Sequence, residues 1–340
     1  MRLPLIDLLK VIASQVIVLH HLVSYGPLSD HLHAVFPRFS EGLYHYGRWA
    51  PQVFLVVSGF LFARVYAPGG VWAGGALWQA WKQRYLRLVL PYGAALLFAV
   101  GAAAIVRPWL GNDPGLPPVP TWKLWWTHVL LVQNILHLES LSAGVWYIAI
   151  DFQLFLLMSV LLWLGRRWPA ASLSLVALGM AASMVGFNRD DTLDDWAIYF
   201  FGSYGLGAMA YWLGKSRSRS SRWELAGVGA LVAVALSLHF RGRLVLACGV
   251  AASLYFSGAW GSRPPGIVAY LSRISYALFL IHYPIVLLAN RVCVQCEIQR
   301  PAAIALCALA TWLASLLAAA LFHHWIESPC IRSVSRSEKI

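Results

Sequence analysis

The sequence predicts an all-α protein, a polytopic membrane bundle of about ten transmembrane helices. The first observation is composition: hydrophobic residues make up 59% of the 340 residues, and charged residues only 12%. A soluble domain carries about 25% charged residues. The second is that apolar runs long enough to cross a bilayer as helices recur along the chain. No shift in composition marks a separate soluble domain, so we predict a single integral membrane domain over residues 1–340.

The predicted spans follow one another closely. They cover residues 4–26, 49–67, 88–106, 146–164, 170–187, 196–213, 224–240, 244–260, 270–290 and 302–326. The first has no small-residue cleavage site and carries polar residues, so we expect it to be retained rather than removed as a signal peptide. The polar segment 27–48 is expected to be a loop. The apolar piece at 124–138 is short for a span and suits a re-entrant or interfacial helix.

The distribution of Lys and Arg predicts that both termini lie inside, because inside loops are enriched in these residues. With 124–138 left out of the count, the inside segments carry most of the 26 Lys and Arg residues, and the acidic segment 190–195 lies outside. Counting 124–138 as a span would turn the basic segment 215–222 outward, against this rule. The net charge of +12 therefore relates to topology and anionic lipid, not to nucleic acid.

The first span is unusual because it carries an acid, a lysine and two adjacent histidines. Ionisable side chains inside a span are costly and by default mark a functional site. Lys10 and His21 are separated by three helical turns plus about 20°, so they share one face, about 16 Å apart. His20 points about 100° away from that face. The alternative is a lysine that extends to the inner surface and a histidine with a structural bond to a neighbouring helix.

On the predicted topology, two further ionisable residues lie at about the same depth in the membrane as His21. Asp151 is the only acid well inside a predicted span, and His282 lies in the outer half of the span 270–290. A lone acid in a membrane needs a partner, and His21 is a candidate. The alternatives are a structural bond from Asp151 to Trp, Tyr or Gln153, and a structural bond from His282 across helices.

The five cysteines indicate few constraints on the fold. Cys293 and Cys296 form a C-x-x-C that would face outside, where a local disulfide can form. We expect no zinc or other metal site, because no second pair of ligands lies nearby.

Five short patterns resemble those of one family of membrane enzymes. They are the K-x10-H pattern at 10–21, Ser-Gly-Phe-Leu at 58–61, R-x-x-R at 84–87, the segment 146–155 and the segment 272–284. Together they resemble the acyltransferase-3 family of integral membrane acyltransferases. Asp151 stands where that family usually has Glu, and Ile148 stands where it has Leu. The resemblance also implies ten spans with both termini inside.

The resemblance implies a role for each matching residue. His21 would be catalytic, and Lys10 would help to hold the acyl donor. Arg84 and Arg87 lie on one helix face, and their planar guanidinium groups suit phosphate, although charge at a cytosolic helix start can also serve topology alone. The predicted roles are catalysis for His21 and Asp151, donor binding for Lys10, Arg84, Arg87 and Ser58, and substrate binding for Trp146, Gln153 and His282.

These positions suggest a reaction path. The length of the pantetheine arm of cytosolic acyl-CoA is on the order of the 16 Å distance between Lys10 and His21. A donor that lies along the first span would therefore bring its thioester near His21. His21 would act as general base on an acceptor hydroxyl or would itself take the acyl group. Asp151 would orient the imidazole. We favour direct base catalysis, but the sequence does not separate the two routes.

The sequence thus predicts a multi-pass O-acyltransferase of a bacterial inner (cytoplasmic) membrane. Its donor would be acetyl-CoA or another acyl-CoA. Its acceptor would be a hydroxyl of a surface or exported polysaccharide or its lipid-linked precursor, which the family resemblance alone implies. The alternative is a transporter or flippase of a lipid-linked glycan, against which the lack of paired broken helices argues. The expected partners are acyl-CoA, glycan and membrane lipid, and the sequence leaves homo-oligomer formation open.

Overall fold

The structure is a computed structural model that describes residues 3–111, 113–216, 219–257 and 264–336. Helix makes up 81% of it, and no strand occurs among the described residues. The all-α fold is thereby confirmed. Residues 217–218 of the basic segment 215–222, which is predicted to lie inside, and the end of the predicted span 244–260 lie outside the described residues.

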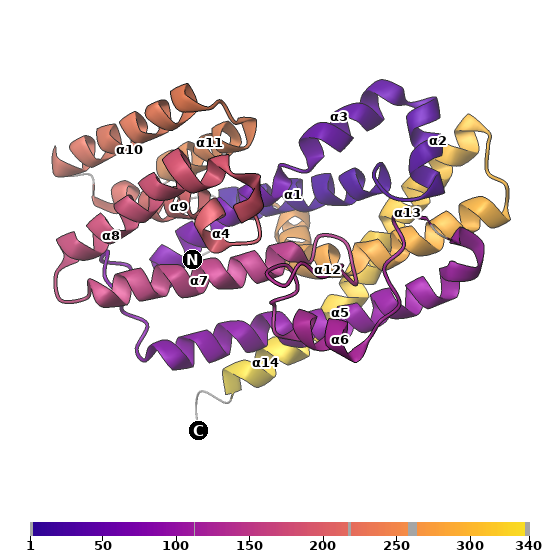
Figure 1. Ribbon diagram of the computed structural model, residues 1–340, viewed down its shortest axis with the longest axis horizontal. Helices are drawn as coiled ribbons and strands as arrows, with labels where there is room; N and C mark the ends of the chain where they lie inside the picture. The colour runs from indigo at the N-terminus through magenta and orange to yellow at the C-terminus, as the bar shows by residue number, and fades with distance from the viewer. Residues whose placement is uncertain (1–2, 112, 217–218, 258–263, 337–340) are drawn as a thin grey trace. The chain divides into compact units, whose positions relative to one another are not determined.

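Fourteen α-helices occur in the described part of the chain, joined by turns and short irregular helices (Figure 1). They are α1 Pro4–Leu22, α2 Pro27–Val35, α3 Pro37–Gly47, α4 Ala50–Tyr66, α5 Leu77–Leu110, α6 Trp122–Val129, α7 Trp146–Leu164, α8 Pro169–Ala181, α9 Ala197–Ser216, α10 Arg219–Leu238, α11 Gly242–Phe256, α12 Gly266–Gln295, α13 Pro301–Phe322 and α14 Ser328–Arg336. A short π-helix, η5 His323–Glu327, joins α13 to α14.

Seven helical segments among the described residues are long and apolar enough to cross a membrane. They are Pro4–Leu22, Pro37–Tyr66, Leu77–Leu110, Trp146–Leu164, Pro169–Arg189, Gly266–Gln295 and Pro301–Val334. Helices α9, α10 and α11 occupy the other three predicted ranges, and α11 is an apolar helix of only 15 residues. The chain is therefore a multi-pass membrane protein, while the count of ten and the orientation stay predictions.

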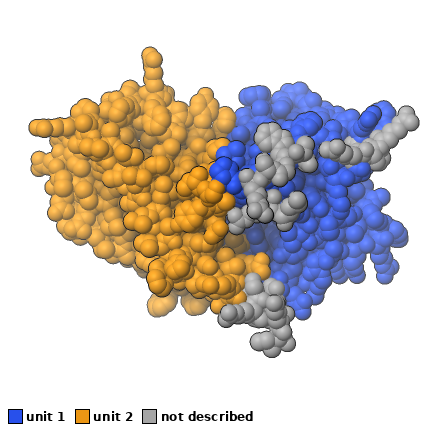
Figure 2. Space-filling view, turned by 180° about the vertical axis from the view of Figure 1, so that it is seen from behind, with its two compact units in different colours: residues 1–9, 51–84, 147–265 blue, residues 10–50, 85–146, 266–340 orange. Residues whose placement is uncertain are grey.

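The chain divides into two compact units (Figure 2). Unit 1 comprises residues 1–9, 51–84 and 147–265, and unit 2 comprises residues 10–50, 85–146 and 266–340. Helices α1 and α5 contribute residues to both units. The prediction of one domain over residues 1–340 stays a prediction.

Two connecting segments differ from the sequence prediction. The segment 27–48, expected to be a loop, forms α2 and α3. Each begins with a proline, which suits the first helical position because it needs no N–H there. The piece expected to be helical over 124–138 is helical only over α6 and then turns, because Leu131 and His137 adopt φ of 59° and 50°. These left-handed values are incompatible with a continuing right-handed helix.

In unit 1, α4 and α9 approach so closely that glycine is required on both helices. A Cβ atom on Gly59 would lie 1.9 Å from the carbonyl oxygen of Tyr204. A Cβ atom on Gly207 would lie 1.9 Å from the carbonyl oxygen of Val56. Small residues allow such backbone contact between membrane helices. The glycine of the Ser-Gly-Phe-Leu pattern is therefore a packing residue.

We expect Gly59→Ala to destabilise the protein by about 3 kcal/mol or more, at the upper end for overpacking, because the added methyl group meets a backbone oxygen. Gly93→Ala is the matched control, since no atom lies within 4 Å of a Cβ there. Thermal unfolding in detergent measures both. Equal midpoints for the two variants would contradict the close crossing.

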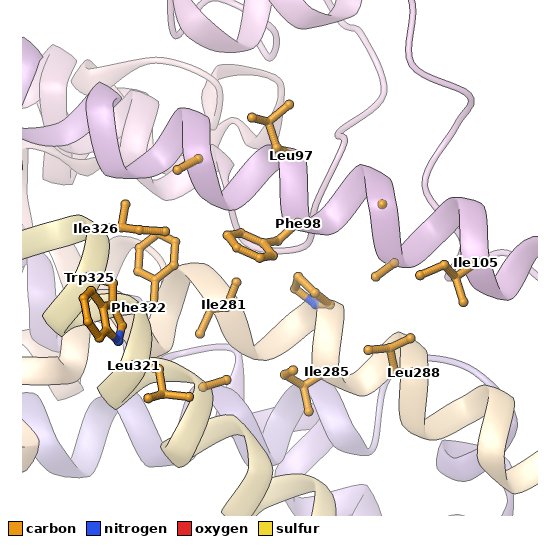
Figure 3. A pocket seen from close by; sticks show the side chains of 15 residues that line it. Leu97, Phe98, Ile105, Ile281, Ile285, Leu288, Leu321, Phe322, Trp325 and Ile326 are labelled. Atoms are coloured by element: carbon orange, nitrogen blue, oxygen red, sulfur yellow. The ribbon is translucent and has the colours of Figure 1, made fainter.

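Unit 2 has its own apolar core, in which the second half of α5 packs against α12. Ala102, Ala103 and Val106 of α5 contact Tyr283 and Leu287 of α12. Beside this core, α5, α12, the end of α13 and η5 surround an apolar cavity of about 660 Å³. Figure 3 shows side chains from these elements, among them Phe98 and Ile285, around it. Phe98 is 52% exposed, so lipid chains can reach this face in a bilayer.

Candidate active site

The two histidines predicted to be functional meet inside unit 2. His21 lies in the last turn of α1, and His282 lies in the interior of α12. The Nδ1 atom of His21 is 2.7 Å from the Nε2 atom of His282, and both side chains are buried. The separation along the chain is 261 residues, so only the tertiary fold brings them together.

The hydrogen bonds of this pair determine where the protons lie. His282 Nδ1 is 2.9 Å from the carbonyl oxygen of Leu278, which can only accept, so this nitrogen carries a proton. In a neutral His282 the Nε2 atom is then an acceptor, and His21 Nδ1 donates to it. The remaining nitrogen of a neutral His21, Nε2, consequently holds a lone pair. An imidazole in this tautomer can accept a proton from a substrate.

Aromatic rings and one glycine border the His21 ring in unit 2. The ring of Tyr25 meets it edge-on with 5.2 Å between centroids, and Tyr25 meets Tyr283 in the same way at 5.3 Å. Gly144 has φ of 75°, and a Cβ atom there would lie 3.4 Å from Cε1 of His21. Any other residue at 144 would be strained. The backbone therefore passes close to the imidazole.

His20 has different partners from His21, as the face argument predicts. Its Nδ1 atom is 3.0 Å from the carbonyl oxygen of Leu43. A Cβ atom on Gly47 would lie only 2.7 Å from Cβ of His20, so α3 packs directly on this side chain. His20 thus holds α3 against α1.

Lys10 lies near an acid that the sequence prediction missed. It interacts electrostatically with Glu327, whose carboxylate is 2.8 Å from Nδ1 of His323. Glu327 is 4% exposed. Glu327 lies one residue beyond the predicted span 302–326, whereas the candidate spanning segment continues to Val334. The signal that the sequence offered for this contact was the position of Glu327, four residues after His323 at the end of an apolar run.

In unit 1, Asp151 of α7 forms an ion pair with Arg84 of α5, in which Arg84 donates to the Oδ2 atom. The Asp151 side chain is 4% exposed and that of Arg84 is 32% exposed. The guanidinium carbon of Arg84 also lies 5.7 Å from the centre of the Phe155 ring. The other carboxylate oxygen, Oδ1, is buried and has no hydrogen-bond partner in the described part of the chain. The sequence indicated that Asp151 needed a partner but did not identify Arg84.

The remaining predicted site residues are divided between the units. In unit 1, Ser58 shares a hydrogen bond with the phenol group of Tyr147, a partner that the sequence did not indicate for Ser58. Both amide atoms of Gln153 bond to backbone, Oε1 accepting from Ala197 N at 3.0 Å and Nε2 donating to Asp195 O at 3.3 Å. Unit 2 contains Lys10, His21, Arg87, Trp146 and His282. The structure therefore brings together His21 with His282, and Arg84 with Asp151, while the predicted roles remain predictions.

The cysteines are all free, including Cys293, which is buried, and Cys296, which is exposed. No group of three or more His, Cys, Asp or Glu side chains that could hold a metal ion occurs among the described residues.

Comparison with known proteins identifies the family. The Acyl_transf_3 family, an acyltransferase domain, matches residues 3–325 of the 340-residue chain. No curated protein and no solved structure matches. The family match covers nearly the whole chain and includes His21, His282, Arg84 and Asp151. The chain therefore belongs to the acyltransferase-3 family and is a multi-pass membrane acyltransferase.

Proposed function

We propose that this enzyme moves an acyl group, most simply acetyl, from acyl-CoA to a hydroxyl group of a surface or exported polysaccharide or its lipid-linked precursor. The observation that carries this proposal is the buried His21–His282 pair, because its hydrogen bonds leave His21 Nε2 as a proton acceptor. A hydroxyl group needs such a base before it can attack a thioester at a useful rate. The family supports acyl transfer in general.

The reaction follows from the lone pair on His21. Nε2 takes the proton of the acceptor hydroxyl while the hydroxyl oxygen attacks the thioester carbonyl carbon. The carbon–sulfur bond then breaks, the new ester leaves, and the imidazolium returns its proton to the departing thiolate, giving free CoA. His282 keeps the His21 ring in place and in the correct tautomer, as orienting groups do in other base-catalysed acyl transfers. We therefore assign His282 a positioning role.

We propose that the donor is held by its phosphate groups. Arg84 fits this role because its ion pair with Asp151 fixes the guanidinium group, while the side chain as a whole remains 32% exposed. A planar, fixed guanidinium group suits phosphate oxygens. Donor binding by Arg87, Lys10 and Ser58 stays a prediction from the sequence. Asp151 would then act through Arg84, and its direct pairing with His21 stays a prediction.

The test uses purified protein with acetyl-CoA and follows the release of free CoA. We expect release that depends on His21 and increases when envelope glycan is added. Mass spectrometry of envelope and secreted glycans from cells with and without the protein would show the loss of an acetyl mass on one glycan. Identical glycans in the two strains, together with no CoA release, would overturn the proposal.

The proposed orientation places the basic segments in the cytosol and the segments near 115 and 192 outside. In a background without the five native cysteines, single cysteines near 115 and 192 should react with a membrane-impermeant thiol reagent in intact cells. Cysteines near 218 and 335 should react only after the membrane is opened. Labelling of position 218 in intact cells would reverse the orientation.

A further inference from the structure

Unit 2 contains a second cavity, of about 480 Å³, that differs from the apolar one because polar groups line much of it. Its walls come from the end of α5, the segments 113–118 and 139–143, and the side chains of Tyr25 and Tyr283. Cavities of roughly 300–1,000 Å³ are typical of small-molecule sites.

This cavity adjoins the histidine pair. Tyr25, which lines it, contacts the His21 ring, and Tyr283, which also lines it, directly follows His282. Ala143 lines the cavity, and the next residue, Gly144, is the one whose backbone passes close to His21 Cε1. The cavity therefore shares Tyr25 with the surroundings of His21 and ends one residue before Gly144, which borders the His21 ring.

Hydrogen bonds hold the cavity wall in shape. Arg107 donates to the carbonyl oxygen of Pro117 at 2.6 Å, and the amide of Gly115 donates to Asp113 Oδ1 at 2.7 Å. The hydroxyl group of Tyr283 donates to the carbonyl oxygen of Gly115. A site that is already formed loses less conformational entropy when a ligand binds.

The groups that line the cavity suit a hydroxyl-rich ligand. Asp113 and Glu139 provide carboxylates, and Ser140 and Ser142 provide hydroxyl groups. Burial, and to a lesser extent Tyr44, raises the pKa of the Tyr25 phenol, so it stays protonated and can donate. Carboxylates accept hydrogen bonds from hydroxyl groups. The cavity lining has two carboxylates and one arginine, and this excess of negative charge disfavours an anionic ligand.

We infer that this cavity binds the sugar unit that carries the acceptor hydroxyl, and that it selects a neutral sugar over an anionic or an apolar ring. This inference rests on the proposed function, because it takes the acceptor to be a glycan.

The experiment blocks the cavity chemically in the full-length protein. Cysteine is placed at Ser140, which lines the cavity, in a background without the exposed and half-buried native cysteines, and is modified with a bulky neutral methanethiosulfonate reagent. The matched control is Leu136→Cys, an exposed position four residues earlier that does not line the cavity. Saturation-transfer NMR then measures binding of methyl glucoside, methyl glucuronide and cyclohexylmethanol.

We expect a saturation-transfer signal from methyl glucoside and at least a tenfold weaker one from the other two probes. Modification at 140 should abolish the glucoside signal, and modification at 136 should leave it unchanged. An unchanged signal after modification at 140, no signal before it, or equal binding of the glucuronide would overturn the inference. Failure of the proposed function is distinguishable from failure of this inference. In that case acetyl-CoA would give no His21-dependent release of CoA, although methyl glucoside would still bind.

Discussion

Replacing His21 by alanine should lower kcat for acyl transfer by about 10²- to 10⁴-fold, the range that a positioned general base contributes. The protein should still insert and fold, because His282 keeps its bond to the carbonyl oxygen of Leu278. The measurement is the rate of ester formation with saturating acetyl-CoA and native glycan, together with the elution profile of the protein in detergent.

His20→Ala is the matched control for this variant. His20 is adjacent in the chain but bonds to Leu43 on α3 and does not bond to His282. We expect it to lower stability modestly and to retain substantial activity. Near-normal turnover by His21→Ala, or equal loss of activity in both variants, would contradict the assignment of the base.

Breaking the Arg84–Asp151 ion pair should have the largest effect on stability. Arg84→Met leaves the carboxylate of Asp151 uncompensated at 4% exposure, and losing one partner of a buried pair costs about 3–5 kcal/mol. Asp151→Leu should cost less, because the Arg84 side chain is 32% exposed, whereas that of Asp151 is only 4% exposed. The double variant Arg84→Met, Asp151→Leu should recover most of the loss, since apolar residues can replace a buried pair.

The same three variants test the proposed donor site. Recovery of stability in the double variant should not restore the KM for acyl-CoA, which should stay at least tenfold above normal because the guanidinium group is gone. Arg166→Met is the control for loss of positive charge in unit 1, since Arg166 is exposed and lies over Trp163. A normal KM in the stable double variant would leave the pair with a structural role only.

Hydropathy predicted the all-α fold and most of its long apolar helices, because the bilayer requires such helices and leaves few alternatives. The orientation that the charges indicate stays a prediction. The segment 27–48 was missed because its helices are polar and short, so neither length nor hydropathy indicated them. The helix predicted over 124–138 was too long, because nothing in the composition of this segment indicated the left-handed turns at Leu131 and His137.

For the candidate site, helical periodicity was enough to separate His21 from His20, because both lie on one regular helix. It did not reveal that His282 would bond to His21, or that Arg84 would bond to Asp151. Those contacts join residues 261 and 67 positions apart, and they depend on how helices pack rather than on any one helix. Glu327 was missed because its burial depends on the continuation of helix beyond the apolar run.

The ion pair between Arg84 and Asp151 also affects how the protein inserts into the membrane during synthesis. Arg84 is synthesised 67 residues before Asp151, a delay of several seconds at bacterial elongation rates of about 5–20 residues per second. During that time α5 has its cation without the acid that neutralises it. When α7 follows, Asp151 enters the membrane at a cost below the roughly 2.5–3.5 kcal/mol of a helix centre, because it lies in the second turn of α7. The ion pair with Arg84 offsets this cost. Insertion of α7 is thereby coupled to its packing against the first turns of α5, which carry Arg84.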